Sequence, residues 1–94
     1  MKFAFLILGD FRHDSDHALI HDGMARIIGV GSIEEACTVA KALSGDGIGC
    51  IELCGAFDPD GARRIIEATH GQIPVGYVTH LPEQDEVYRA AFGE

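Results

Sequence analysis

The feature of this sequence that most constrains its fold is a recurring order: a short apolar run, a turn that carries a helix-start signal, then a helical pattern. Strands that are joined by short helical crossovers lie parallel to one another in a sheet. The sequence therefore predicts an α/β domain with a four-stranded, mainly parallel sheet. The predicted strands are Phe3–Leu8, Ala25–Val30, Ile48–Leu53 and Ile73–Val78.

The helix-start signals lie between these runs and after the last one. Glu35 follows Ser32 at the spacing of a capping box, which predicts a helix that Ser44–Gly47 stops. Asp58 precedes a proline, the pattern of an N-cap with proline in the first helical position, and Pro82 opens a last helix. These signals predict one helix between the second and third strands, one between the third and fourth, and one after the fourth.

A further short helix is expected from Ser15 to His21, between the first two strands. With it, right-handed crossovers favour an open sheet with helices on both faces and the flavodoxin-like strand order 2-1-3-4. The alternative, if this helix does not form, is a ferredoxin-like α+β sandwich.

Composition narrows the class of function. A chain of 94 residues fits one domain, residues 1–94, and 47% hydrophobic residues exclude disorder. Acidic residues outnumber basic ones by 15 to 7, and the net charge of −8 disfavours nucleic-acid and anionic membrane partners. The run Phe3–Leu8 is too short for a signal peptide or a membrane span. Three cysteines without a metal-type pairing motif complete the expectation of a cytoplasmic protein.

The carboxyl ends of the predicted strands are where an open parallel sheet binds ligands. Ligand-binding candidates at these ends are Asp10, Gly31, Ser32, Gly55 and Asp58. The glycines allow a ligand to approach the backbone closely, and helix starts at Ser32 and Asp58 supply free N–H groups for an anion. The alternative role of Ser32 and Asp58 is ordinary helix capping. No nucleotide phosphate-loop motif is present.

Glu52 stands out because it lies inside a strand that is predicted to be central. Alternation places it on the same face as Cys50 and Cys54. A carboxylate in that position is paired with a cation, solvated at the strand end, or used as a functional acid or base. The structural hypothesis pairs it with Arg26 or Arg63, and the functional one makes it a candidate catalytic residue.

Cys54 and His80 complete the catalytic candidates with Glu52. Cys54 ends the same strand just before a predicted helix start, a position that can activate a thiol. His80 follows the next strand and is a candidate base for it. The alternative is a small apolar cysteine beside a solvated histidine.

Three histidines recur at every fourth position: His13, His17 and His21. On one helix, two of them at spacing i, i+4 can chelate a divalent metal, so His17 and His21 are weak metal candidates. The alternative is a solvated polar face. The cofactor, if any, is unknown from the sequence.

Several stretches resemble one family: Lys2–Phe5, Gly31–Ala36, Pro74–Gly76 and, most specifically, Ile51–Phe57 with the sequence IELCGAF. The chain resembles the small prokaryotic proteins grouped as domain of unknown function 6506. The resemblance implies a single α/β domain and brings no known activity or catalytic residues.

Three hypotheses of function remain. The first is a domain that binds a small polar or anionic metabolite at the strand ends, and the sequence leaves open whether this domain is also an enzyme. The second is a module for oligomerisation or partner binding, since the sheet edges carry little lysine or proline and favour a homodimer or higher oligomer. The third is metal binding through the histidine run.

Overall fold

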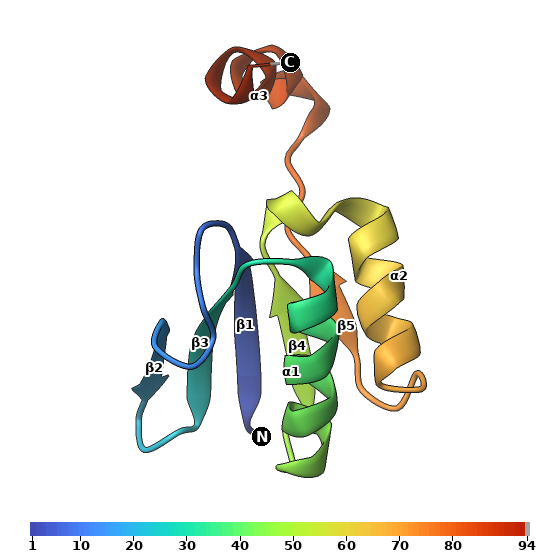
Figure 1. The fold of residues 1–94 in the computed structure, drawn as a ribbon. Helices are drawn as coiled ribbons and strands as arrows, with labels where there is room; N and C mark the ends of the chain where they lie inside the picture. Colours follow the sequence, from blue (N-terminus) through green and yellow to red (C-terminus); the bar gives the residue numbers. More distant parts are fainter. Residues whose placement is uncertain (94) are drawn as a thin grey trace.

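The computed structural model describes residues 1–93, and within this range the strands form one sheet in the order β2-β3-β1-β4-β5 (Figure 1). All neighbouring strands are parallel except β2 and β3, which pair antiparallel. The strands are β1 (Phe3–Leu8), β2 (His17–Ile20), β3 (Ala25–Val30), β4 (Cys50–Leu53) and β5 (Val75–Tyr77). The helices are α1 (Ile33–Gly45), α2 (Asp58–Ala68) and α3 (Asp85–Phe92), with 3-10 turns at Gly55–Phe57 and Pro82–Gln84.

The prediction of a mixed α/β domain with a mostly parallel sheet is confirmed. The four predicted strands correspond to β1, β3, β4 and β5, and they lie in the predicted relative order. The difference lies in the sheet edge, where β2 adds a strand that the sequence analysis did not predict.

The helix predicted from Ser15 to His21 is wrong. His17–Ile20 instead forms β2, which returns to β3 through a tight turn in which His21 and Asp22 have φ of 52° and 56°. The side chains of β2 are exposed, so a helix here would have had no buried stripe to stabilise it, whereas the antiparallel ladder with β3 satisfies the backbone.

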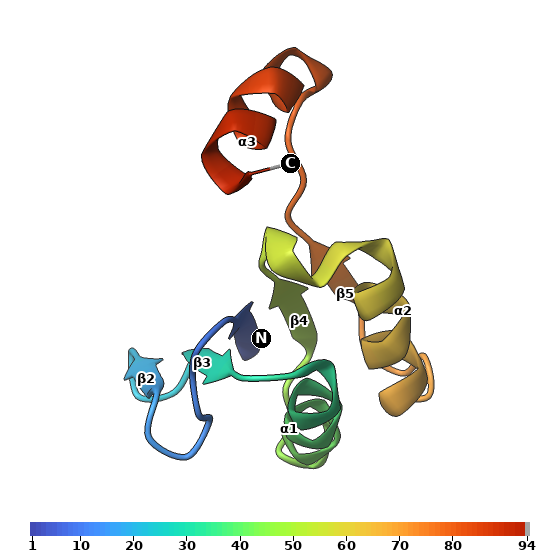
Figure 2. The same ribbon diagram turned by 45° about the horizontal axis from the view of Figure 1, so that its top comes forward.

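This replacement changes how the sheet is covered. The chain passes from β3 over β1 to β4 through α1, and then in the same direction to β5 through α2. Right-handed crossovers in one direction place both helices on the same face, as Figures 1 and 2 show. The prediction of helices on both faces is therefore wrong. The ferredoxin-like alternative does not apply either, because its sheet is antiparallel, whereas three of the four strand pairings here are parallel.

The core lies between the sheet and the two helices α1 and α2. Ala4 and Leu6 of β1, the central strand, are fully buried there, and Phe57 from the 3-10 turn closes the core near the strand ends. Further buried side chains are Val30, Ala36, Ala40, Leu43, Ile51, Leu53 and Ile65.

The other face of the sheet, named here the open face, carries the alternate residues of each strand. No helix among residues 1–93 packs on it (Figures 1 and 2). Strand register places the following residues on the open face: Phe3, Phe5, Ile7, Ala18, Ile20, Ala25, Ile27, Gly29, Cys50, Glu52 and Gly76. Phe11 lies across Gly29, where a Cβ atom would come within 2.7 Å of its side chain.

The start of α1 is capped as predicted, with one addition. Ser32 Oγ accepts the Glu35 N–H at 3.0 Å. The Glu35 carboxylate accepts the backbone N–H groups of His13 and Gly31, each at 2.8 Å, and also contacts the His13 ring. Glu35 thus ties the loop between β1 and β2 to the start of α1.

These contacts lower the pKa of Glu35 from 4.5 to about 2, through the His13 N–H first, then the Gly31 N–H and the His13 ring. A carboxyl with a lowered folded-state pKa stabilises the fold above its unfolded pKa. This contribution is lost as the pH falls from about 4.5 to about 2.

We therefore expect the free energy of unfolding to fall more steeply over that pH range in the wild type than in Glu35→Gln, which does not titrate. Urea unfolding at a series of pH values measures the free energy of unfolding of both proteins. Glu67→Gln, a change in an exposed carboxyl on α2 that forms no ion pair with residues 1–93, is the control and should keep the wild-type slope. Equal slopes for wild type and Glu35→Gln would contradict the assignment.

Candidate functional site

A cleft of about 850 Å³ lies at the carboxyl ends of the parallel strands, between the body of the domain and α3. Its floor comes from the ends of β1 and β4 and the start of α2, and its far wall from α3. The segment after β5 joins the two. The residues that line it are Leu8, Cys54, Gly55, Ala56, Asp58, Pro59, Tyr77, Val78, Thr79, His80, Asp85, Tyr88, Arg89 and Phe92.

The helix α3 stands apart from the body, at the end of an extended connection after β5 (Figures 1 and 2). His80 fixes it to this connection: His80 Nε2 lies 2.8 Å from Asp85 Oδ1, and its ring stacks on Tyr88 with centroids 3.8 Å apart. Tyr88 in turn stacks on Phe92. These contacts are local, so they orient α3 without burying it.

The apolar side chains of α3 therefore lack packing contacts with the body of the domain. None of the α3 side chains, all of which the structure describes, is buried, and Phe92 is 73% exposed. An eight-residue helix is marginal in water without tertiary packing. The side of α3 that carries Tyr88, Arg89 and Phe92 lines the cleft, so an occupant of the cleft would supply the missing contact.

Cys54 and His80 both line this cleft, as the parallel strand order requires. The Cys54 sulfur accepts the N–H of Leu8 at 3.3 Å. Within residues 1–93 no hydrogen bond joins the Cys54 thiol to the His80 ring, which contacts Asp85 and Tyr88 instead. The sequence analysis did not single out Asp85, Tyr88 or Arg89, because an exposed helix gives no signal of the surface that it faces.

Glu52 lies elsewhere, on the open face. Its carboxylate occupies the space above Gly76 on β5, where a Cβ atom would collide with it. The predicted ion pair with Arg26 or Arg63 is wrong, because Arg26 lies 3.4 Å from Asp46 and Arg63 lies 2.8 Å from its neighbour Asp60. Arg26 points to the helix side of the sheet, so it cannot reach the open face.

The remaining strand-end candidates have structural roles. Ser32 caps α1, and Gly31 packs against the Phe11 carbonyl oxygen, which a Cβ atom would approach within 2.8 Å. Gly55 lines the cleft near Val78. Asp10 is exposed and does not line the cleft.

Asp58 is the exception, because it combines capping with backbone strain. Its Oδ1 accepts the Gly61 N–H at 3.0 Å at the start of α2. Its φ of 54° lies in the left-handed region, which is costly for a residue with a Cβ atom. The hydrogen bond and the strain together hold the Asp58 carboxylate at the cleft.

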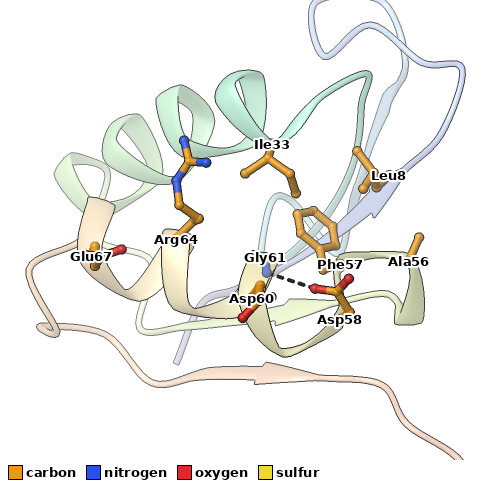
Figure 3. Close-up of a pocket in the computed structure, with 9 residues that line it drawn as sticks. All are labelled: Leu8, Ile33, Ala56, Phe57, Asp58, Asp60, Gly61, Arg64 and Glu67. Atoms are coloured by element: carbon orange, nitrogen blue, oxygen red, sulfur yellow. Dashed lines mark hydrogen bonds between the residues drawn. The ribbon is translucent and has the colours of Figure 1, made fainter.

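Asp58 also borders a second, smaller groove of about 490 Å³ on the helix side (Figure 3). Ile33 and Phe57 form its apolar floor, and Arg64 reaches over it toward α1. The Arg64 guanidinium lies 3.8 Å from Glu34, so this cation is already paired. Its smaller volume and its paired arginine make this groove a poorer candidate for ligand binding than the cleft.

The histidine run does not form the helical chelate that the spacing suggested. His13 contacts Glu35, and His17 Nδ1 lies 3.0 Å from the His13 carbonyl oxygen. His21 lies in the turn after β2, because the segment is a strand and turn rather than a helix. Among the described residues, no group of three or more metal-ligating side chains is close enough to hold an ion. In the same range, no helix has the length and apolar character needed to span a membrane.

A comparison with protein families identifies the family of this chain. The model of the Family of unknown function (DUF6506) matches residues 1–93. The chain belongs to this family. No curated protein and no solved structure matches it. The DUF6506 match includes α3 as well as the sheet, so every segment that lines the cleft is part of the family domain.

The cysteines provide a test of the environment of Glu52. Burial first, and then the charge of Glu52, raise the pKa of the Cys50 thiol. Glu52→Gln removes the second cause, so more thiolate forms and alkylation of Cys50 should quicken by about twofold or more. Iodoacetamide labelling of the native protein, followed by peptide mass spectrometry, measures this rate. Glu67→Gln, an exposed change on α2, is the control, and an unchanged Cys50 rate in Glu52→Gln would contradict the coupling.

The cap at Asp58 predicts a stability difference between two variants. Asp58→Ala loses the hydrogen bond to the Gly61 N–H and should lower the free energy of unfolding by about 0.5–2 kcal/mol. Asp58→Asn keeps an acceptor oxygen for the Gly61 N–H, so it should lose less. Denaturant unfolding compares the two. Equal losses would show that the cap contributes nothing.

Proposed function

We propose that this protein binds a small metabolite with an anionic group in the cleft between the strand ends and α3. The observation that carries the proposal is the cleft itself, which lies outside the carboxyl ends of β1, β4 and β5. This is the position at which open parallel sheets bind ligands. Its volume of about 850 Å³ falls in the usual range for small-molecule sites.

The cleft lining carries one guanidinium, Arg89, that can bind an anionic group. Arg89 lies on the cleft side of α3 and forms no ion pair with any of residues 1–93. The two carboxylates that line the cleft are already engaged, Asp58 with the Gly61 N–H and Asp85 with His80. A guanidinium without an ion-pair partner among residues 1–93 can bind a carboxylate or phosphate.

The walls of the cleft favour an apolar or aromatic body on the same ligand. Tyr77, Tyr88 and Phe92 present aromatic rings to the cleft. A ligand that fills the space between them and the strand ends would bury the apolar side of α3, whose exposure is otherwise unfavourable. Binding would then stabilise α3 against the body.

Binding is the function proposed, rather than catalysis. Cys54 and His80 share the cleft, but His80 is engaged by Asp85 and Tyr88, and Glu52 lies on the open face. A nucleophile and its base need to lie within hydrogen-bond reach. We also propose a cytoplasmic location, which the free thiols of Cys37, Cys50 and Cys54 support.

Thermal unfolding against a panel of small carboxylates and phosphates tests the proposal. A ligand at 100 times its Kd adds about 2.7 kcal/mol of stability, which for a domain of this size raises Tm by roughly 10 °C or more. We expect Arg89→Gln to abolish this rise. Arg63→Gln, which removes an exposed cation on α2 far from the cleft lining, is the matched control and should keep it. A panel without any stabilising compound, or a rise that survives Arg89→Gln, would contradict the proposal.

A further inference from the structure

The open face is the largest feature that the cleft leaves unexplained. Its apolar side chains gather on β1, β2 and β3, and Phe11 from the loop after β1 extends them. Phe3, Ile20 and Ile27 are 40%, 49% and 38% exposed. Adjacent exposed side chains of this size on one sheet face mark an interaction surface.

The topology explains why this face is uncovered. A right-handed crossover from β1 to β3 would run opposite to the two crossovers through α1 and α2, and would place a helix on the open face. The chain makes this connection through β2 instead, which lies at the sheet edge. As a result, no helix among residues 1–93 covers the apolar residues of β1 and β3 on this face.

We propose that a second copy of this chain covers the open face, so that two sheets pack against each other about a two-fold axis. A symmetric dimer needs only one self-complementary patch. Two twisted sheets with apolar inner faces pack in this way in β-sandwiches, about 10 Å apart. The result is a four-layer dimer, with α1 and α2 of each copy on the outside.

The described structure exposes 6068 Å², against roughly 5,300 Å² for a compact monomer of this mass. The open face and the exposed helix α3 both contribute to this excess, and a second copy on the open face would remove part of it.

The charges favour self-association through the open face over self-association through any other surface of the chain. Two copies of net charge −8 repel each other over most of their surfaces. Among the strand residues of the open face, Glu52 alone is charged, and it lies on β4, opposite Phe5 of β1. A contact centred on β3 leaves Glu52 two strands away, toward the rim of the interface.

The sheet edges are poorer surfaces for self-association than the sequence analysis assumed. β2 has four residues and β5 has three, and Pro74 precedes β5. Short edges offer few free N–H and C=O groups to a neighbouring strand. The contact therefore belongs to the face of the sheet.

Light scattering after size-exclusion chromatography tests the proposal on the full chain at micromolar concentration. We expect about twice the chain mass of 10.1 kDa for the wild type. Ile27→Glu places a charge at the centre of the open face and should halve the measured mass. Ile66→Glu makes the same change at a residue of equal exposure on α2, 39%, and should leave the dimer intact.

Two further variants make the result decisive. Ile20→Lys repeats the test at a more exposed position in case Ile27→Glu fails to fold, which circular dichroism would reveal. Val87→Glu alters the exposed side of α3, and the dimer should survive it. A monomeric wild type would overturn the proposal, and a different protein would then be the candidate partner of the open face. A dimer that Val87→Glu dissociates, but neither sheet variant does, would overturn it in favour of contact through α3.

Discussion

The burial of one sheet face beneath α1 and α2 is the constraint on which the rest of this structure depends. Ala4, Leu6 and Ile51 are fully buried there, and the burial fixes the register of the parallel strands. Because both crossovers run in one direction, they use only one face of the sheet. The opposite face also carries apolar side chains, which no helix among residues 1–93 covers, and this imbalance is the basis of the proposed interaction surface.

The same parallel order creates the cleft. The carboxyl ends of β1, β4 and β5 meet at one edge, and the chain leaves β5 toward α3 at that edge. The stacking of His80 on Tyr88 then holds α3 over the strand ends. The proposed binding site therefore arises from the direction of the strands and from a helix too short to be stable alone. The site and the open face occupy different parts of the sheet, so ligand binding and self-association are separable in experiment.

The sequence analysis succeeded where local signals agree with the fold and failed where they do not. Ser32 and Asp58 were predicted as helix starts and form the expected hydrogen bonds, because capping depends on residues three apart. The segment His17–Ile20 was predicted as part of a short helix, Ser15 to His21, between the first two predicted strands. Pairing with β3 decided its structure, and no local pattern reports the availability of that strand.

The candidate site also combines residues that the sequence predicted with residues that only the tertiary structure brings to it. The sequence by itself determined the apolar runs, their parallel order and the position of Cys54 and His80 at strand ends, because periodicity and connection length act along the chain. Only the tertiary structure decided that Glu52 lies on an uncovered face over Gly76, and that Arg89 and Tyr88 line the cleft. Those facts depend on which face the helices cover and on where α3 stands. Both are set by packing between segments far apart in the sequence, which no single stretch of it encodes.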